Sequence, residues 1–289
     1  MPLPAEIPLR TGRMKLPLGS LFWHEGGTQT ETVIFLHGSW HDSTQWLGVM
    51  RQLAPKVHCL APDLLGFGES WREGKTPYSV ALQVEALHSL LGALRIHRCR
   101  LVGHSLGAWV AGQYALTYPD QVQSLAVLAP EGVSDRALRG RWQRDRWLVA
   151  PWSPLPLMLP WLGNSPWAKA LRDRRHCLRQ APAACKMLFQ RRTAAINGEL
   201  LQTRLGQLGL PTLVLASTAA EPTAHQLTQA WLNQLPNAHH RELSPADTPL
   251  GVDEDNCAAA LGQLITSALA DRTRVIYPPT PVPPSSAAL

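Results

Sequence analysis

Short apolar, β-branched runs alternate with longer helical patterns between residues 32 and 130. This alternation is typical of βαβ units, which build a parallel sheet with helices on its faces. Strands are expected at residues 33–38, 57–63, 99–104 and 124–130, and helices at 44–53, 78–94 and 106–118. The pattern therefore predicts an α/β fold with a mostly parallel sheet flanked by helices.

The alternation breaks after Gly132, where a stretch rich in Arg, Trp and Pro begins. It returns with an expected strand at 211–217, a helix at 223–235, a strand at 239–244 and a final helix at 256–271. An insertion in mid-sheet explains this break best. The predicted organisation is a core in two parts, residues 1–133 and 206–272, with an inserted helical cap at 134–205 and a Pro-rich tail at 273–289.

Length and composition fit one globular α/β domain with an inserted subdomain. The chain has 289 residues, of which 45% are hydrophobic and 17% are charged. Its start lacks the apolar segment of a secretory signal, and no run of about 18 apolar residues predicts a membrane span. The five cysteines form no CxxC pair, which favours free thiols in a reducing compartment. These features predict a cytoplasmic protein.

The segment GHSLG at residues 103–107 matches the pattern GxSxG and lies between an expected strand and an expected helix. The pattern alone is weak, but this position is that of a nucleophile elbow. Such a turn strains the backbone of the serine and needs glycines beside it, because neighbouring backbone comes too close for a side chain. Ser105 is therefore a candidate nucleophile at the carboxyl end of the sheet. The alternative is an ordinary serine at a helix N-cap.

The segment HGSW at residues 37–40 follows the first strongly apolar strand. A loop at this place can supply backbone N–H groups to an oxyanion, each contributing a factor of about 100 to 1,000 in rate. The amides of Ser39 and Leu106 are the candidate donors, and we expect a structural role for His37. The candidate oxyanion and substrate-binding residues are Gly38, Ser39, Trp40, His104 and Leu106.

Together with DLLGFGES at residues 63–70, these two segments resemble the α/β-hydrolase superfamily in its esterase, lipase and epoxide-hydrolase-like branch. The resemblance covers residues 32–272 and implies an α/β-hydrolase fold with a cap inserted after the strand at 124–130. It also implies that Gly66 and Gly68 serve the conformation of a turn rather than chemistry. The activity that it implies is attack by a serine on an ester or related acyl group.

The same resemblance reveals two departures from the family pattern. The family's acid follows the first strand after the cap, where this chain has Ala220 and then Glu221. Its histidine follows the last expected strand, where this chain has Thr248, preceded by Asp247. Positions 220 and 248 are 28 residues apart, a separation that the family's helix and strand also need. The usual acid and histidine are therefore substituted.

Glu131, in LAPEG after the last strand before the cap, occupies a position where some members of the superfamily keep their acid instead. It is the candidate substitute acid beside a catalytic Ser105. The base stays open among His41, His225, His239 and His240, each of which is also explained as a surface or packing histidine. A serine without a base is weakly nucleophilic, so catalysis requires a histidine or carboxylate within hydrogen-bond reach of the Ser105 hydroxyl.

The expected cap is strongly basic and rich in tryptophan. Residues 134–205 contain 14 Lys/Arg and 4 Asp/Glu, a net charge of +10, whereas the rest of the chain carries −4. Residues 147–167 are apolar and contain five prolines, which exclude one continuous helix. The tryptophans and flanking arginines are Trp147, Trp152, Trp161, Trp167, Arg139, Arg141, Arg144, Arg146, Arg172, Arg174, Arg175 and Arg179. Such a segment either packs on the sheet as an apolar pocket wall or lies on an anionic membrane surface.

Two hypotheses follow. In the first, the chain is a serine hydrolase for a small apolar carboxylic ester or related acyl substrate, with Ser105 and Glu131 catalytic. In the second, it is a catalytically degenerate pseudoenzyme that binds an apolar ligand, a protein partner or a membrane surface, the last as a peripheral protein. The sequence contains no GxGxxG, no Walker loop and no metal-ligand cluster, so neither cofactor nor metal is expected. No recognition motif accompanies the basic charge, so no nucleic-acid partner is expected.

Overall fold

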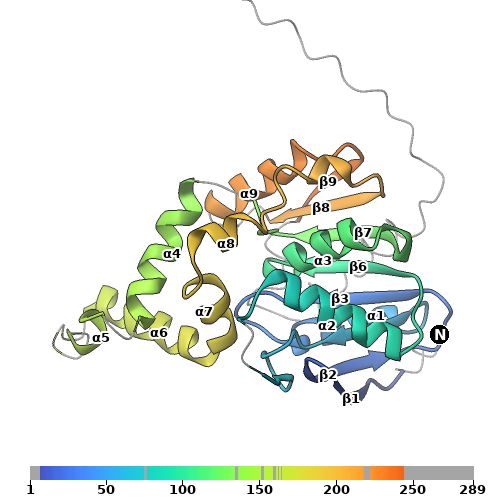
Figure 1. The fold of residues 1–289 in the computed structure, drawn as a ribbon, viewed down its shortest axis with the longest axis horizontal. Coiled ribbons are helices and arrows are strands. Elements are labelled where there is room, and N and C mark those ends of the chain that lie inside the picture. The colour runs from blue at the N-terminus through green and yellow to red at the C-terminus, as the bar shows by residue number, and fades with distance from the viewer. Residues whose placement is uncertain are drawn as a thin grey trace, which may run out of the picture.

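A computed structural model describes residues 7–74, 77–133, 136–150, 153–158, 161, 163, 165–217 and 222–243. Its centre is a sheet with strand order β1-β2-β4-β3-β6-β7-β8-β9, in which β5 also pairs with β2. The strands are β1 (Arg10–Leu16), β2 (Gly19–Gly26), β3 (Thr32–Leu36), β4 (His58–Pro62), β5 (Trp71–Arg72), β6 (Cys99–His104), β7 (Val122–Leu128), β8 (Thr212–Ser217) and β9 (Ala238–Leu243). The five successive pairs from β4–β3 to β8–β9 are parallel. The predicted fold class is confirmed (Figure 1).

The first two strands form an antiparallel hairpin that the apolar pattern did not predict. β1 pairs with β2 along its whole length, from Arg10 opposite Glu25 to Leu16 opposite Gly19. β1 lies at the edge of the sheet, and all of its residues are exposed or half-buried. Its sequence therefore carries the polar residues that protect an edge strand, and its apolar alternation is weak.

Helices cover both faces of the sheet, because the central strands are apolar on both sides. In β3, Ile34 and Leu36 belong to one core cluster, while Val33 and Phe35 belong to the other. α2, α3 and α9 contribute to the first cluster, and η1 and α1 contribute to the second. These helices are η1 (Ser43–Trp46), α1 (Leu47–Leu53), α2 (Val80–Ala93), α3 (Leu106–Thr117), η2 (Pro119–Gln121) and α9 (Pro222–Leu232).

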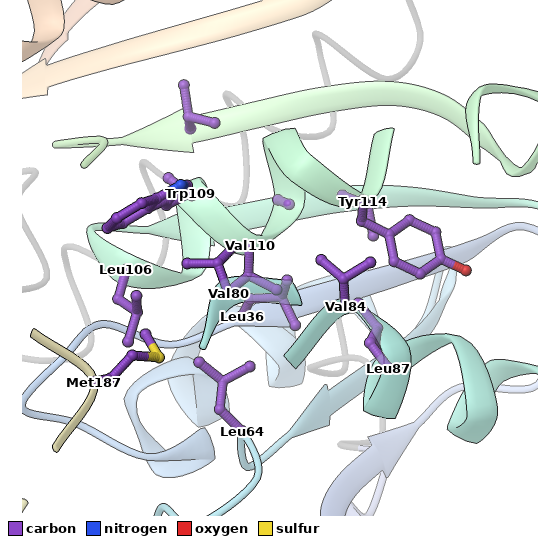
Figure 2. Close-up of a cluster of buried hydrophobic side chains, with 14 of the residues drawn as sticks. Leu36, Leu64, Val80, Val84, Leu87, Leu106, Trp109, Val110, Tyr114 and Met187 are labelled. Carbon is purple, nitrogen blue, oxygen red and sulfur yellow. The ribbon is translucent and has the colours of Figure 1, made fainter. Parts of the chain in front are cut away.

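The helix that follows Ser105 is buried on nearly all sides. From Leu106 to Ala115 every residue of α3 except Gln113 is buried, as expected for a helix enclosed by other elements. Figure 2 shows its side chains among those of the neighbouring elements, with Trp109 near one end and Tyr114 near the other. A helix held in this way gives the elbow at its start a rigid support.

Between β7 and β8 the described chain is helical. It forms α4 (Arg136–Val149), α5 (Leu155–Met158), α6 (Pro166–Gln180), α7 (Pro182–Leu188), α8 (Thr193–Asn197) and η4 (Leu205–Gln207). α4, α5 and α6 extend away from the sheet, to the left in Figure 1. α7 packs into the main core, where Met187 shares a cluster with Leu106 (Figure 2). The limits proposed for the cap, residues 134 and 205, stay a prediction.

Several predicted features lie outside the described residues. These are Ala220, Glu221, Asp247 and Thr248, the helix at 256–271 and the tail at 273–289. None of the described helices combines the length and hydropathy needed to cross a bilayer. Elsewhere the predicted elements are present with shifted ends, since the helix expected at 44–53 begins as the 3-10 turn η1 and the helix expected at 223–235 ends at Leu232.

We expect Gly107→Ala to destabilise the fold by about 3 kcal/mol, because overpacking against atoms that cannot move is costly. A Cβ at Gly107 would lie 2.2 Å from the carbonyl oxygen of Leu36, a backbone atom of the central strand. The matched control is Gly92→Ala in α2, where a Cβ meets nothing within 4 Å. That change should stabilise the protein by about 0.8 kcal/mol. Equal unfolding free energies of the two variants in denaturant titrations would contradict this account.

Candidate active site

Ser105 forms the sharp turn between β6 and α3. Its φ of 52° and ψ of −112° are unusual for a residue other than glycine, and such backbone strain costs about 1–3 kcal/mol. Two backbone bonds hold the turn: the Ser105 N–H donates to Leu128 O at 3.0 Å, and Ser105 O accepts from Glu131 N at 3.2 Å. The neighbouring strand β7 and the residues after it therefore maintain the strained conformation.

The Ser105 hydroxyl does not cap the helix. Ser105 stands at the N-cap position of α3, yet its side chain makes no capping hydrogen bond. Instead Ser105 Oγ donates to Glu131 Oε1 at 3.0 Å. The structure thus brings together the two residues that the sequence suggested as catalytic. A carboxylate lies within hydrogen-bond reach of the serine, which was the geometric requirement for serine chemistry.

Glu131 is 4% exposed, and its backbone is anchored from two sides. The indole Nε1 of the fully buried Trp231, on α9, donates to Glu131 O at 3.1 Å. The following residue, Gly132, has a φ of 94° and accepts at its carbonyl from Leu201 N at 2.7 Å. These contacts hold the carboxylate in place beside Ser105. Trp231 lies 100 residues from Glu131 along the chain, and no pattern in the sequence pointed to it.

The loop containing Gly38 and Ser39 lies directly against the elbow. A Cβ built on Gly38 would lie 3.4 Å from Ser105 Cβ and 2.5 Å from His104 Nδ1, so only glycine fits there. Leu106 is the first residue of α3, and the first N–H groups of a helix have no partner within it. The Leu106 amide, at the positive end of the helix dipole, is therefore suited to stabilise an anion beside Ser105.

Ser39 itself is almost completely enclosed. It is 1% exposed, and its Oγ has no hydrogen-bond partner among the described residues. Leaving a buried hydroxyl without a partner costs about 1–3 kcal/mol. A buried polar group that is left unsatisfied in this way is a frequent feature of functional sites.

Gln45 joins the oxyanion loop to the elbow. Its Oε1 accepts from Gly38 N at 3.1 Å, and its Nε2 donates to His104 Nδ1 at 3.0 Å. Because His104 Nδ1 accepts a hydrogen bond, it carries no proton, and the imidazole is therefore neutral. Burial lowers the pKa of His104 to about 3, and the nearby His41 and His37 contribute in the same direction. Nothing in the sequence pattern pointed to Gln45.

His37 has the structural role that was expected of it. Its Nδ1 donates to Gly38 O at 2.9 Å, and its Nε2 accepts from Leu64 N at 2.9 Å. The ring thereby fixes the oxyanion loop to the turn at residues 63–70. Burial lowers the pKa of His37, which keeps the imidazole neutral and able to accept the Leu64 amide.

The other histidines considered as bases do not bond to Ser105 within the described part of the chain. His239 and His240 are exposed on β9, three strands from β6, a separation of roughly 14 Å at the usual strand spacing. His225 is exposed on α9. The ring of His41 lies beside that of His104, with centroids 5.8 Å apart. Of the described side chains, the one that hydrogen-bonds to the serine hydroxyl is therefore that of Glu131.

Trp40 connects the oxyanion loop to the cap. The guanidinium of Arg174, on α6, lies 4.8 Å from the centre of the Trp40 ring, and the Phe189 ring stacks with it at 6.1 Å. Arg174 is itself held by Asp145 of α4, with Nε donating to Oδ1 at 3.1 Å and a second contact between Nη2 and Oδ2. A cation over an indole contributes about 0.5–2 kcal/mol. The cap and the oxyanion loop are thus packed together.

The buried cysteines Cys59, Cys99 and Cys185 are not alternative nucleophiles. Cys59, Cys99, Cys177 and Cys185 are free. Burial raises the pKa of both Cys59 and Cys99 to about 12, which keeps these thiols protonated. Cys185 is buried as well and donates to Leu178 O, and burial raises its pKa to about 11.

Comparison with known proteins finds a matching family model and several similar sequences. A family model described as the alpha/beta hydrolase family matches residues 33–260. The 2-hydroxymuconate semialdehyde hydrolase of Pseudomonas sp. (strain CF600) is 35% identical over 105 residues, which are 35% of this chain and 37% of that protein. Monoacylglycerol lipase ABHD6 of Homo sapiens is 32% identical over 104 residues, which are 35% of this chain and 31% of that protein. These matches span about a third of the length of the two relatives.

Solved structures share the fold over nearly the whole chain. An esterase from Thermogutta terrifontis, described as thermophilic, superposes with a TM-score of 0.67 at 20% identity. The superposition covers 90% of this chain and 98% of that one. At this level of identity the likeness is one of fold.

We expect His104→Gln to reduce the loss of stability in acid. Because burial holds the pKa of His104 at about 3, against 6.5 in the unfolded chain, the unfolded state takes up a proton first as the pH falls. This contribution to stability is complete above pH 6.5 and is lost towards pH 3. Between pH 6.5 and 5, the variant should lose about 2 kcal/mol less than the natural protein. Denaturant titrations at the two pH values measure the difference.

The control for this prediction is His239→Gln, which makes the same change on an exposed strand position. It should leave the pH dependence of the unfolding free energy unchanged. Parallel stability curves for His104→Gln and the natural protein would show that the buried imidazole does not account for the acid sensitivity.

Proposed function

Because the chain belongs to the α/β-hydrolase family, we propose that it is a serine hydrolase acting on an apolar carboxylic ester or a related acyl substrate. The observation that carries the proposal is the hydrogen bond from Ser105 Oγ to Glu131 Oε1, made from a strained elbow. A nucleophile and a base in direct contact are the minimum that covalent catalysis needs. Ser105 is also partly exposed, so a substrate can reach it.

In the first half-reaction Ser105 Oγ attacks the carbonyl carbon, and its proton passes to Glu131 Oε1. The carbonyl oxygen becomes negatively charged and accepts hydrogen bonds from the amides of Ser39 and Leu106. When the tetrahedral intermediate collapses, the bond to the leaving oxygen breaks, and that oxygen takes the proton from Glu131. The products of this step are an alcohol and an acyl group on Ser105.

In the second half-reaction water attacks the acyl carbon and gives a proton to Glu131. The intermediate collapses, the bond to Ser105 Oγ breaks, and Glu131 returns the proton to the serine. A carboxylate has an ordinary pKa of about 4.3 and is a weaker base than imidazole near neutral pH. We therefore expect turnover to be slow compared with that of an enzyme with a histidine base.

The apolar substrate class is supported by the side chains that surround the elbow. Met187 of α7 shares a buried cluster with Leu106, the residue after Ser105, and Trp40 and Phe189 stack where the cap meets the oxyanion loop. Apolar walls with a few polar groups at the reacting centre are typical of small-molecule sites. The activity in the name of one similar protein, a monoacylglycerol lipase, agrees with a carboxylic ester.

A fluorophosphonate probe should label Ser105, since such probes react with activated serines. We expect one adduct by intact mass, none in Ser105→Ala, and labelling about 100-fold slower or more in Glu131→Gln, because a general base contributes at least that factor. The control is Glu199→Gln, which changes a carboxylate that bonds to Arg191 and Val80 instead of to the serine. That variant should be labelled at the natural rate.

Two outcomes would contradict the proposal. Equal labelling of the natural protein and Glu131→Gln would exclude Glu131 as the base. Absence of labelling in folded protein would mean that the site performs no serine chemistry. That result would favour the second hypothesis, in which the chain is a pseudoenzyme that binds an apolar ligand. The expected substitutions at Ala220 and Thr248 point in the same direction.

The buried Ser39 hydroxyl is in addition a candidate third donor to the oxyanion. We expect Ser39→Ala to slow labelling by about 100-fold, the effect of losing one such donor. Because Ser39 Oγ has no partner among the described residues, its removal should leave the unfolding free energy unchanged or raised. The control, Ser43→Ala, removes an equally buried hydroxyl that bonds to His24 Nδ1 at 2.9 Å. It should cost about 1 kcal/mol of stability and leave the rate unchanged.

A further inference from the structure

The cap carries most of the exposed large apolar side chains of the described residues. Five such residues are strongly exposed, and four of them lie between positions 147 and 167: Trp147 (46%), Met158 (54%), Trp161 (89%) and Trp167 (55%). The fifth, Trp71 (46%), lies on β5, which pairs with β2. Exposed apolar side chains that cluster in this way mark an interaction surface.

These four side chains belong to one end of the cap. Trp147 is in the last turn of α4, Met158 ends α5, and Trp167 is in the first turn of α6. This end, with α5 at its tip, is the part of the cap that projects farthest from the sheet in Figure 1. Arg172 of α6 donates to Gly163 O at 2.9 Å, which ties the segment around Trp161 to the helix. We call this end of the cap, residues 144–172, the cap tip.

Positive charge surrounds the same apolar side chains. α4 and α6 together contain ten Lys/Arg and two Asp. Of the two acids, Asp145 is buried and already paired with Arg174. Arg144, Arg146 and Lys169 are exposed. The cap tip therefore exposes both cations and indole rings, and Asp173 is the one exposed acid on the two helices α4 and α6 as described.

We propose that the cap tip docks on an anionic lipid surface. Trp favours the interface between water and hydrocarbon, because its ring is apolar and its N–H still finds a partner there. Lys and Arg near an anionic leaflet each contribute about 1 kcal/mol. A polynucleotide would match the charge alone, whereas a lipid surface matches both the charge and the four apolar side chains. The proposal goes beyond the proposed reaction and adds a surface from which acyl esters can be drawn.

The test is flotation of the Ser105→Ala protein with unilamellar vesicles, so that binding is measured without turnover. The protein should float with vesicles of phosphatidylcholine and phosphatidylglycerol and stay behind with phosphatidylcholine alone. Trp161→Ala with Trp167→Ala should weaken binding about tenfold or more, because two exposed rings no longer bury apolar area. Arg144→Gln with Arg146→Gln should weaken it about 30-fold and reduce its salt dependence.

The control is Trp71→Ala, which removes an exposed indole that lies on β5, outside the cap tip. It should float like the parent protein. All of these positions are exposed, so truncation leaves the core intact, and thermal unfolding checks this for each variant. Because every variant carries Ser105→Ala, the result is independent of whether the serine reacts with the fluorophosphonate probe.

The proposal is overturned if the parent protein stays in solution with anionic vesicles, or if the cap variants float as well as Trp71→Ala. It is likewise overturned if a single-stranded oligonucleotide binds the protein and the vesicles do not. The same holds if sedimentation shows that Trp161 and Trp167 join two copies of the chain and leave no surface for lipid.

Discussion

The hydrogen bond between Ser105 and Glu131 is the interaction on which the rest of the site depends. Its two ends follow neighbouring parallel strands, β6 and β7, and parallel strands end at the same edge of a sheet. Backbone bonds between the two turns, from Ser105 N to Leu128 O and from Glu131 N to Ser105 O, fix their distance. The pair of strands that maintains the strained backbone of Ser105 therefore also places Glu131 beside it.

The short distance also bears on the proton transfer in the proposed reaction. Two oxygens 3.0 Å apart are in direct contact, so no imidazole ring fits between them. A relay through histidine needs the acid to be farther from the serine, with the ring in the intervening space. In the proposed mechanism Glu131 takes the proton itself. This agrees with the neutral, differently engaged imidazole of His104 and with the prediction that Thr248 replaces the family's histidine.

Features that depend on local sequence were predictable. The buried strands are visible in the sequence as apolar runs. GHSLG and HGSW are recognisable because their glycines allow a backbone geometry that few other residues permit. Contacts across the chain were not predictable. Gln45 bonds to His104 over 59 residues and Trp231 to Glu131 over 100, and neither position differs from an ordinary helix residue in the sequence. The hairpin of β1 and β2 was missed because an edge strand carries little apolar signal.

The arginines of the cap divide into two groups that the composition alone does not distinguish. Arg174 and Arg191 bond to the buried or half-buried carboxylates of Asp145 and Glu199. Arg174 moreover lies over Trp40 of the oxyanion loop, so its charge stabilises the contact between cap and site. Arg144 and Arg146 are exposed and bond to none of the carboxylates that the structure describes. The inward group holds α6 against the loop at Trp40, and the outward group adds positive charge to the exposed surface of the described residues.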